Sequence, residues 1–578
     1  MSLVAIPAQL LAPLERLSAT SAPFIARLIA TLGGPRNARL LTVSLAVAYF
    51  GMRIAALFTV PRHLRHLPIL NASQVIHFLV RNGGSGAKGG YLQRHHEQMV
   101  VLRAEAVAKG TLSARDASRG DTPAVWASWL LGKYAINVAN PEDMKAMLTQ
   151  HDLYDKVDMS KLGLISSREL LGQNVALAPM HAWKHQRKVV NPAFRRGWAT
   201  SLFAHPTFPL LHKFDDLADR GADVDISAWM GRLTLDALST VGFGANFDSI
   251  GNPDSRLVTL YHQVMGTLVA PVGFMFGRLA NYFPSQIRAV GRIREFNGYI
   301  LDMINAKTKA IAARRSRGEM QDEGAEDTRD LLELMIDAAE SGATTIEELR
   351  ANTVIFFIAG HDTTANALTF AMYLLGQYPE VQRKARAEVL AATGDAAMGT
   401  AVEDLPYPTN DQQQKEMPYL TMIIKETMRL FPPLAQVPFR ITTREAKLAD
   451  GTVLPQGSLV SGHILAVQRS TAVWGPDANE FRPERWESSV SDTLTADGGV
   501  PLHPSAHNYS WTPFGGGQRI CLGQQFSLIE QRVVLALMLV RYEWTVAGNA
   551  DAVAGEPTTV PGTLLHPIDI QLRMKRRN

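Results

Sequence analysis

FGGGQRICLG, the stretch Phe514–Gly523, contains Cys521, the only cysteine of the 578-residue chain. A single thiol excludes an internal disulfide and a zinc site built on several cysteines. Cys521 is therefore a buried apolar residue, a nucleophile or a lone thiolate ligand. The surrounding glycines let the backbone approach a flat object closely, and the helix-forming sequence from Gln524 onward can stabilise a sulfur anion. These surroundings favour the ligand.

The stretch matches the pattern F-x-x-G-x-R-x-C-x-G, so the chain resembles the cytochrome P-450 family, whose haem-binding signature this is. The resemblance covers roughly residues 110–570 and points to the eukaryotic microsomal type. It implies that Cys521 is the thiolate ligand of the iron in heme b (iron protoporphyrin IX). The other specified positions of the signature are then cofactor-binding: Phe514, Gly517, Arg519 and Gly523.

Residues 345–378 predict a long helix that crosses the protein interior. Thr345 and Glu348 form a capping box, and Pro379 supplies the stop. Most of the segment is apolar all round, which is typical of a buried helix. Its middle nevertheless reads AGHDTT (359–364), and an acid with two hydroxyls is costly there unless these groups have partners or a task.

The AGHDTT block is similar to the family motif A-G-x-D/E-T-T. The resemblance implies a bulge over the haem near Gly360, with Asp362 and Thr363 relaying protons to dioxygen. His361 occupies a variable position of the motif and receives no role. The alternative is a kinked core helix whose threonine hydroxyls bond back to its own carbonyls.

A second set of motifs concerns structure and the haem carboxylates. Glu426 and Arg429 form E-x-x-R, and the resemblance implies that Arg485 of FRPERW (481–486) completes a buried structural triad with them. In W-x-x-x-R, Trp183 and Arg187 share a helix face, and the family uses this pair at a haem propionate. The resemblance assigns further propionate-binding arginines, each of which could instead lie at the surface: Arg440 and Arg519.

The expected fold is mainly α with a minor β portion, the cytochrome P-450 fold with a long central helix over the haem. Residues 1–68 are expected to be membrane-associated, because 40–60 contain 21 positions with one charge, Arg53, and a helix of about 31 Å matches a bilayer core. A buried or surface-lying helix is the alternative. Residues 69–110 are expected to be a linker and entry segment, and 111–578 the haem-thiolate catalytic domain.

The resemblance implies a monooxygenase that inserts one oxygen atom of dioxygen into a lipophilic substrate by hydroxylation or epoxidation. No flavin or ferredoxin domain is recognised, so electrons are expected from a separate NADPH–cytochrome P-450 reductase, with cytochrome b5 as an optional second donor. Lys184 and Lys188 are candidate docking residues for the reductase. The formal net charge of +4 gives no reason to expect a nucleic-acid partner.

The catalytic domain is expected to face the cytosol from the endoplasmic reticulum membrane. The resemblance also implies the pocket lining: residues 158–178, Phe356, Phe357, and the segments 434–439 and 560–564. Two other functions stay open. One is a haem-thiolate peroxygenase or isomerase that needs no reductase, and the other is a non-catalytic haem carrier or gas sensor.

Overall fold

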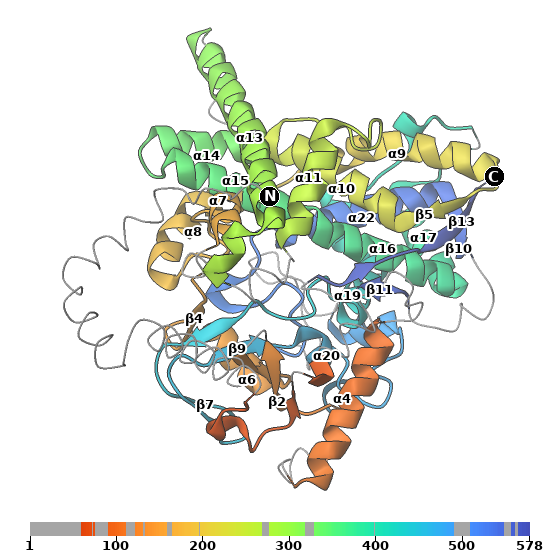
Figure 1. Cartoon of the computed structure of the whole chain (residues 1–578). Helices are drawn as coiled ribbons and strands as arrows, with labels where there is room; N and C mark the ends of the chain where they lie inside the picture. The colour runs from red at the N-terminus through yellow and green to blue at the C-terminus, as the bar shows by residue number, and fades with distance from the viewer. Residues whose placement is uncertain are drawn as a thin grey trace, which may run out of the picture. The chain divides into compact units, whose positions relative to one another are not determined.

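The computed structural model describes residues 59–71, 73–75, 91–110, 122–130, 133–158, 164–195, 197–268, 277–317, 329–397, 399–489, 509–547, 557–560 and 564–577. Clustering of its contacts separates Met1–Pro61 with Leu131–Lys133 from a unit of Arg62–Leu130 and Tyr134–Asn578. The larger unit carries every residue of the candidate site described below. Within it, the helices α9, α10, α13 and α16 lie together, apart from the strands β2, β4 and β9 (Figure 1).

Helices dominate the described chain, which confirms the predicted mainly α fold. In the first half they are α4 (Tyr91–Ala108), α6 (Pro141–Thr149), α7 (Ile165–Leu171), α8 (Met180–Arg195), α9 (Ser201–Asp219), α10 (Ile226–Phe243), α11 (Arg256–Leu268) and α13 (Pro284–Ser316). In the second half they are α14 (Leu331–Glu340), α15 (Ile346–Gly360), α16 (Asp362–Gln377), α17 (Pro379–Thr393), α18 (Asn410–Lys415), α19 (Pro418–Leu430), α20 (Ile464–Gln468), α21 (Thr471–Trp474) and α22 (Gln524–Arg541).

The larger sheet has the strand order β1-β2-β3-β9-β6-β4. Its strands are β1 (Ile69–Leu70), β2 (Val125–Leu130), β3 (Lys133–Val138), β4 (Tyr154–Lys156), β6 (Arg440–Thr442) and β9 (Leu459–Gly462). A second sheet, β10-β13-β5, joins Tyr542–Val546, Gln571–Arg576 and Asp223–Asp225. Two short pairs complete the β portion: β7 (Ala446–Lys447) with β8 (Val453–Leu454), and β11 (Thr559–Val560) with β12 (His566–Pro567).

The predicted interior helix is two helices, α15 and α16, which meet at His361. The capping box at Thr345 and Glu348 is present, and the second helix ends before Pro379, as predicted. The second helix lies in the middle of the core, where it packs against α10, α19, α22 and β10. Its residues are buried on all sides, which accounts for the uninterrupted apolar sequence.

The predicted membrane segment, residues 40–60, lies outside the described residues except for Thr59 and Val60. Among the helices that are described, none is long and apolar enough to cross a bilayer. The domain boundaries at residues 68 and 110 stay predictions.

Candidate functional site: a thiol-bearing pocket

The glycines of the loop before Cys521 are required by its backbone. Gly515 and Gly517 have φ angles of +74° and +64°, in the left-handed region that favours glycine. A Cβ at Gly517 would overlap the carbonyl oxygen of Leu148, so α6 and the loop approach each other directly. The backbone N–H of Cys521 donates to the carbonyl of Phe514 over 3.0 Å, which closes the loop beneath the thiol.

Cys521 lines a cavity of about 300 Å³, within the range of small-molecule sites. Burial raises the pKa of its thiol, while the backbone N–H of Gly523 and the charge of Arg187 oppose that rise. Arg187 also donates a hydrogen bond of 2.9 Å to the carbonyl of Ile520, which ties α8 to the loop. The sulfur therefore sits in a mostly apolar enclosure with an N–H group and a cation close to it.

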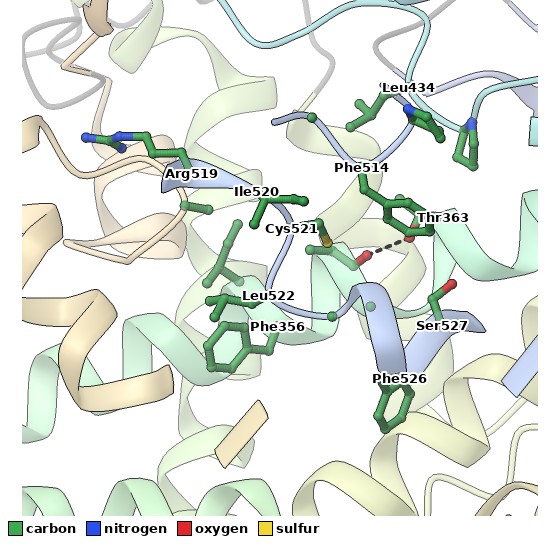
Figure 2. Close-up of a pocket in the computed structure, with 18 of the residues that line it drawn as sticks. Phe356, Thr363, Leu434, Phe514, Arg519, Ile520, Cys521, Leu522, Phe526 and Ser527 are labelled. Carbon is green, nitrogen blue, oxygen red and sulfur yellow. Dashed lines mark hydrogen bonds between the residues drawn. The ribbon is translucent and has the colours of Figure 1, made fainter. Parts of the chain in front are cut away.

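The opposite wall of the cavity is the junction of α15 and α16. Gly360 and Thr363 line it, and Figure 2 shows Thr363 in the same pocket as Cys521. The Thr363 hydroxyl donates to the carbonyl of Ala359 over 2.8 Å. The alternative interpretation of AGHDTT predicts such a hydrogen bond from a threonine hydroxyl to a carbonyl of its own helix. The bond is present, and both of its residues line the cavity. A Cβ at Gly360 would approach a side-chain methyl of Leu238 on α10 to 2.8 Å, so a larger residue would require that side chain to shift.

Thr364 links the junction to the helix that follows the cysteine. Its hydroxyl donates to Ser527 on α22 over 2.9 Å, and both residues line the cavity. No motif singles out Ser527, because it lies in an ordinary helical stretch. The hydrogen bond joins the two walls of the cavity at one edge.

Asp362 is not among the residues that line the cavity. Its carboxylate lies 3.0 Å from Nε2 of His361, which is buried. Burial alone would raise the pKa of Asp362, but the charge and hydrogen bond of His361 outweigh this effect, and the pKa is lowered. The acid is thus held in its charged form beside the cavity.

A group of cations lines another part of the cavity. Arg440 is 2% exposed, and its Nε and Nη1 have no hydrogen-bond partner among the described residues; the same holds for Nε of Arg519. Burial, together with neighbouring charge, lowers the pKa of each guanidinium to about 10. The Arg519 guanidinium also stacks on Trp183, 4.6 Å from the ring centroid.

Lys156 also lines this part of the cavity, and His151 lies near the arginines without lining it; the motifs of the sequence indicate neither residue. Lys156 faces Arg440 in the register of β4 and β6, where like charges repel. Burial and the charges of both arginines hold the pKa of Lys156 well below its usual range. His151 is buried, and neither of its ring nitrogens has a hydrogen-bond partner within the described part of the chain. Burial lowers its pKa to about 4. Lys156 comes close to Arg440 only because β4 pairs with β6, a strand almost 300 residues later in the chain. A local motif cannot show such a pairing.

Haem fits this arrangement. The guanidinium nitrogens of Arg440 and Arg519 that have no partner among the described residues suit two carboxylates, the thiol suits iron, and the glycines leave room for a flat ring against the loop. Asp155, 3.7 Å from Arg519, is the one carboxylate paired with this group in the described structure. Further negative charge from a ligand would therefore stabilise the site.

Some predicted site residues have other neighbours. Gly517 shapes the loop without lining the cavity. Phe357 was expected in the pocket, which is wrong: it stacks on Phe243 with centroids 4.2 Å apart, because neighbouring helix residues point in different directions. Phe356 does line the cavity, and the segments 158–178 and 434–439 each contribute side chains. Residues 159–163 and 561–563 lie outside the described part of the chain.

A loop that presents one thiol to a cavity also lined by buried arginines has the features expected of a haem-thiolate protein. A model of the cytochrome P-450 family matches residues 117–574, and the chain belongs to this family. It is an enzyme of the monooxygenase class that this family comprises.

Curated relatives agree with the family. The chain is 28% identical to cytochrome P-450 72A552 of Barbarea vulgaris over 428 residues, which cover 72% of this chain and 75% of the relative. It is 26% identical to cytochrome P-450 monooxygenase xanG of Aspergillus fumigatus, with 72% and 75% covered. It is 29% identical to cytochrome P-450 4B1 of Rattus norvegicus, with 71% and 76% covered. These relatives come from a plant, a fungus and a mammal, as expected for the eukaryotic type.

Proposed function

We propose that this enzyme inserts one oxygen atom of dioxygen into a lipophilic substrate, using electrons from a separate NADPH-dependent reductase. The proposal rests on one observation. Cys521, from the loop before α22, and Thr363, from α16, line the same cavity. A thiolate-ligated haem supplies the activation of dioxygen and the transfer of an oxygen atom to a C–H or C=C bond. The residues of the protein would bind the haem, orient the substrate and supply protons.

Three groups of side chains divide these tasks. Cys521 Sγ is the iron ligand. Arg440, Arg519 and Lys156 bind the haem carboxylates, with His151 beside them and Trp183 under the Arg519 guanidinium. Arg187 donates a hydrogen bond to the Ile520 carbonyl. We therefore assign it to holding the cysteine loop in place and not to binding a haem carboxylate.

Thr363 and Asp362 serve proton delivery. The Thr363 hydroxyl, which donates to the Ala359 carbonyl, lies at the cavity wall and would hold a proton for delivery into the cavity. Asp362 carries the negative charge that can take up and pass on a proton one residue away. General acid groups of this kind contribute rate factors of about 10²–10⁴.

The remaining cavity wall is apolar, which suits a lipophilic substrate. Its side chains come from α8, α10, α15 and the segment before β6, and include Phe194, Leu238, Phe356, Leu434 and Val437. Burying a lipophilic substrate against such a wall contributes about 25 cal/mol per Å² of apolar surface.

The redox partner and the membrane belong to this proposal as well. Lys184 and Lys188 are exposed on α8, the helix whose Arg187 touches the cysteine loop. A reductase or cytochrome b5 that docks there would approach the cysteine loop, which would hold the haem iron. The apolar segment 40–60 supports membrane attachment at the endoplasmic reticulum, with the catalytic domain on the cytosolic side.

The test uses Thr363→Ala with reductase, NADPH and a substrate found by screening. The variant should consume NADPH but release peroxide, and its product per NADPH should fall about tenfold or more. Thr369→Ala is the matched control, because Thr369 makes the same bond to a helix carbonyl, 2.8 Å to Ala365, without lining the cavity. Turnover of the wild type without NADPH and reductase would favour a peroxygenase or isomerase. A folded, haem-loaded protein with no turnover would favour a carrier or sensor.

A further inference from the structure

A buried chain of three polar side chains approaches the cavity from outside its wall. Tyr261 on α11 places its hydroxyl 2.9 Å from Nδ1 of His361, and Nε2 of His361 lies 3.0 Å from Asp362. Tyr261 and His361 are 0% and 1% exposed, so neither is a solvated surface group. Buried polar networks of this kind are costly unless every member is satisfied.

The geometry accommodates both protonation states of His361. In the neutral ring, the Tyr261 hydroxyl donates to Nδ1 while Nε2–H donates to the Asp362 carboxylate. In the cationic ring, Nδ1–H donates to the Tyr261 oxygen, and the hydroxyl hydrogen can turn to the Phe357 carbonyl, 3.4 Å away. A buried histidine with a partner for each nitrogen in either state can gain and lose a proton without leaving a group unsatisfied.

Two further histidines act on the same carboxylate. His566 from β12 and the exposed His262 from α11 both help to lower the pKa of Asp362 electrostatically. His262 is next to Tyr261 in the chain. Partial desolvation of its ring, together with the charges of His361 and Arg232, lowers its pKa, although the charge of Asp362 opposes this. Three histidines, His361, His262 and His566, thus act electrostatically on the Asp362 carboxylate.

We propose that His361 is a positioning residue that reloads Asp362 with protons from the α11 side, while Tyr261 fixes its ring. This inference rests on the proposed function. In the transfer, the Nε2–H bond of the imidazolium breaks and an O–H bond forms on Asp362, which leaves a neutral imidazole and a neutral acid. Rotation of the acid side chain carries the proton toward Thr363. The imidazole regains its proton from water, which enters on the exposed His262 side.

The first test does not depend on turnover. A histidine-selective NMR titration of the haem-loaded protein, in its ferrous carbonyl form, follows the His361 ring. Asp362→Asn should lower the pKa of His361 by about one unit or more, because an opposite charge within hydrogen-bonding distance is lost. Tyr261→Phe should also change this titration. A His361 titration unaffected by both substitutions would overturn the proposal.

The second test measures coupling, as product formed per NADPH consumed. His361→Gln keeps an amide donor for Asp362 but carries no exchangeable ring proton, so coupling should fall about tenfold with KM unchanged, and the acidic limb of the pH profile should shift. His212→Gln is the control, because His212 pairs with Glu403 on the surface. Coupling and a pH profile equal to wild type in a folded His361→Gln protein would overturn the inference. Failure of the wild type to turn over would instead contradict the proposed function, and the NMR titration would still decide the inference.

Discussion

Glu426 and Arg429 are joined by two hydrogen bonds of 2.8 Å, and both side chains are completely buried. Arg485 Nε lies 3.3 Å from the same carboxylate, and Trp486 donates to it over 3.0 Å. The Arg429 guanidinium also donates hydrogen bonds to the carbonyls of Gln468 and Ala478. One carboxylate therefore joins α19 to the chain that leads toward the cysteine loop.

Removing this carboxylate should unfold the protein rather than impair chemistry selectively. Glu426→Gln leaves the buried Arg429 guanidinium without a carboxylate, while Arg485 keeps its pair with Asp477, and breaking such a buried pair costs about 3–5 kcal/mol. Urea unfolding of the variant measures the loss. Glu105→Gln, which removes an exposed pair with Lys109, should change the stability by less than about 1 kcal/mol. Equal losses in the two variants would contradict a buried structural triad.

Two glycines of the loop give a matched comparison. Gly515 and Gly517 both have positive φ, so alanine strains the backbone by about 1 kcal/mol at each. Only at Gly517 does the added Cβ meet another backbone group, the Leu148 carbonyl, whereas at Gly515 it meets nothing within 4 Å. In the haem-free protein, Gly517→Ala should therefore lower the free energy of unfolding by at least about 2 kcal/mol more than Gly515→Ala. Similar values would show that α6 does not press on the loop.

Arg440 should have opposite effects with and without the cofactor. In the haem-free protein its buried charge has no partner at Nε or Nη1, so Arg440→Met should stabilise the fold or leave it unchanged. With haem, the lost carboxylate contact should raise the haem dissociation constant about tenfold. Thermal unfolding and haem transfer to a scavenger protein measure the two effects. Arg444→Met, at an exposed pair with Asp152, should change neither.

His151 should make the haem-free protein sensitive to acid. Burial lowers its pKa in the folded state to about 4, below the unfolded value of about 6.5, so the unfolded chain binds more protons between these values. The free energy of unfolding should fall by about 2 kcal/mol as the pH drops through this window. The stability that depends on neutral His151 is fully present only above the window. His151→Phe should remove that part of the pH dependence. A wild type and variant with parallel stability curves from about pH 6.5 to 4 would contradict the assignment.

The cysteine loop and the AGHDTT junction could be predicted because their chemistry is local in sequence. Gly517, Arg519 and Cys521 lie within five residues, and each is specified by backbone geometry or charge. Lys156 and His151 could not be found in this way, since they become neighbours of Arg440 only when β4 pairs with β6. His361 was passed over because the motif does not specify its position, and its partner Tyr261 comes from another helix.

The central claim, a haem bound through the thiolate of Cys521, is tested most directly by the absorption spectrum of the dithionite-reduced protein under carbon monoxide. The account predicts a strongly red-shifted Soret band in the wild type that is absent in a folded Cys521→Ser variant. A band typical of histidine ligation, or a folded wild-type protein that binds no haem, would contradict it.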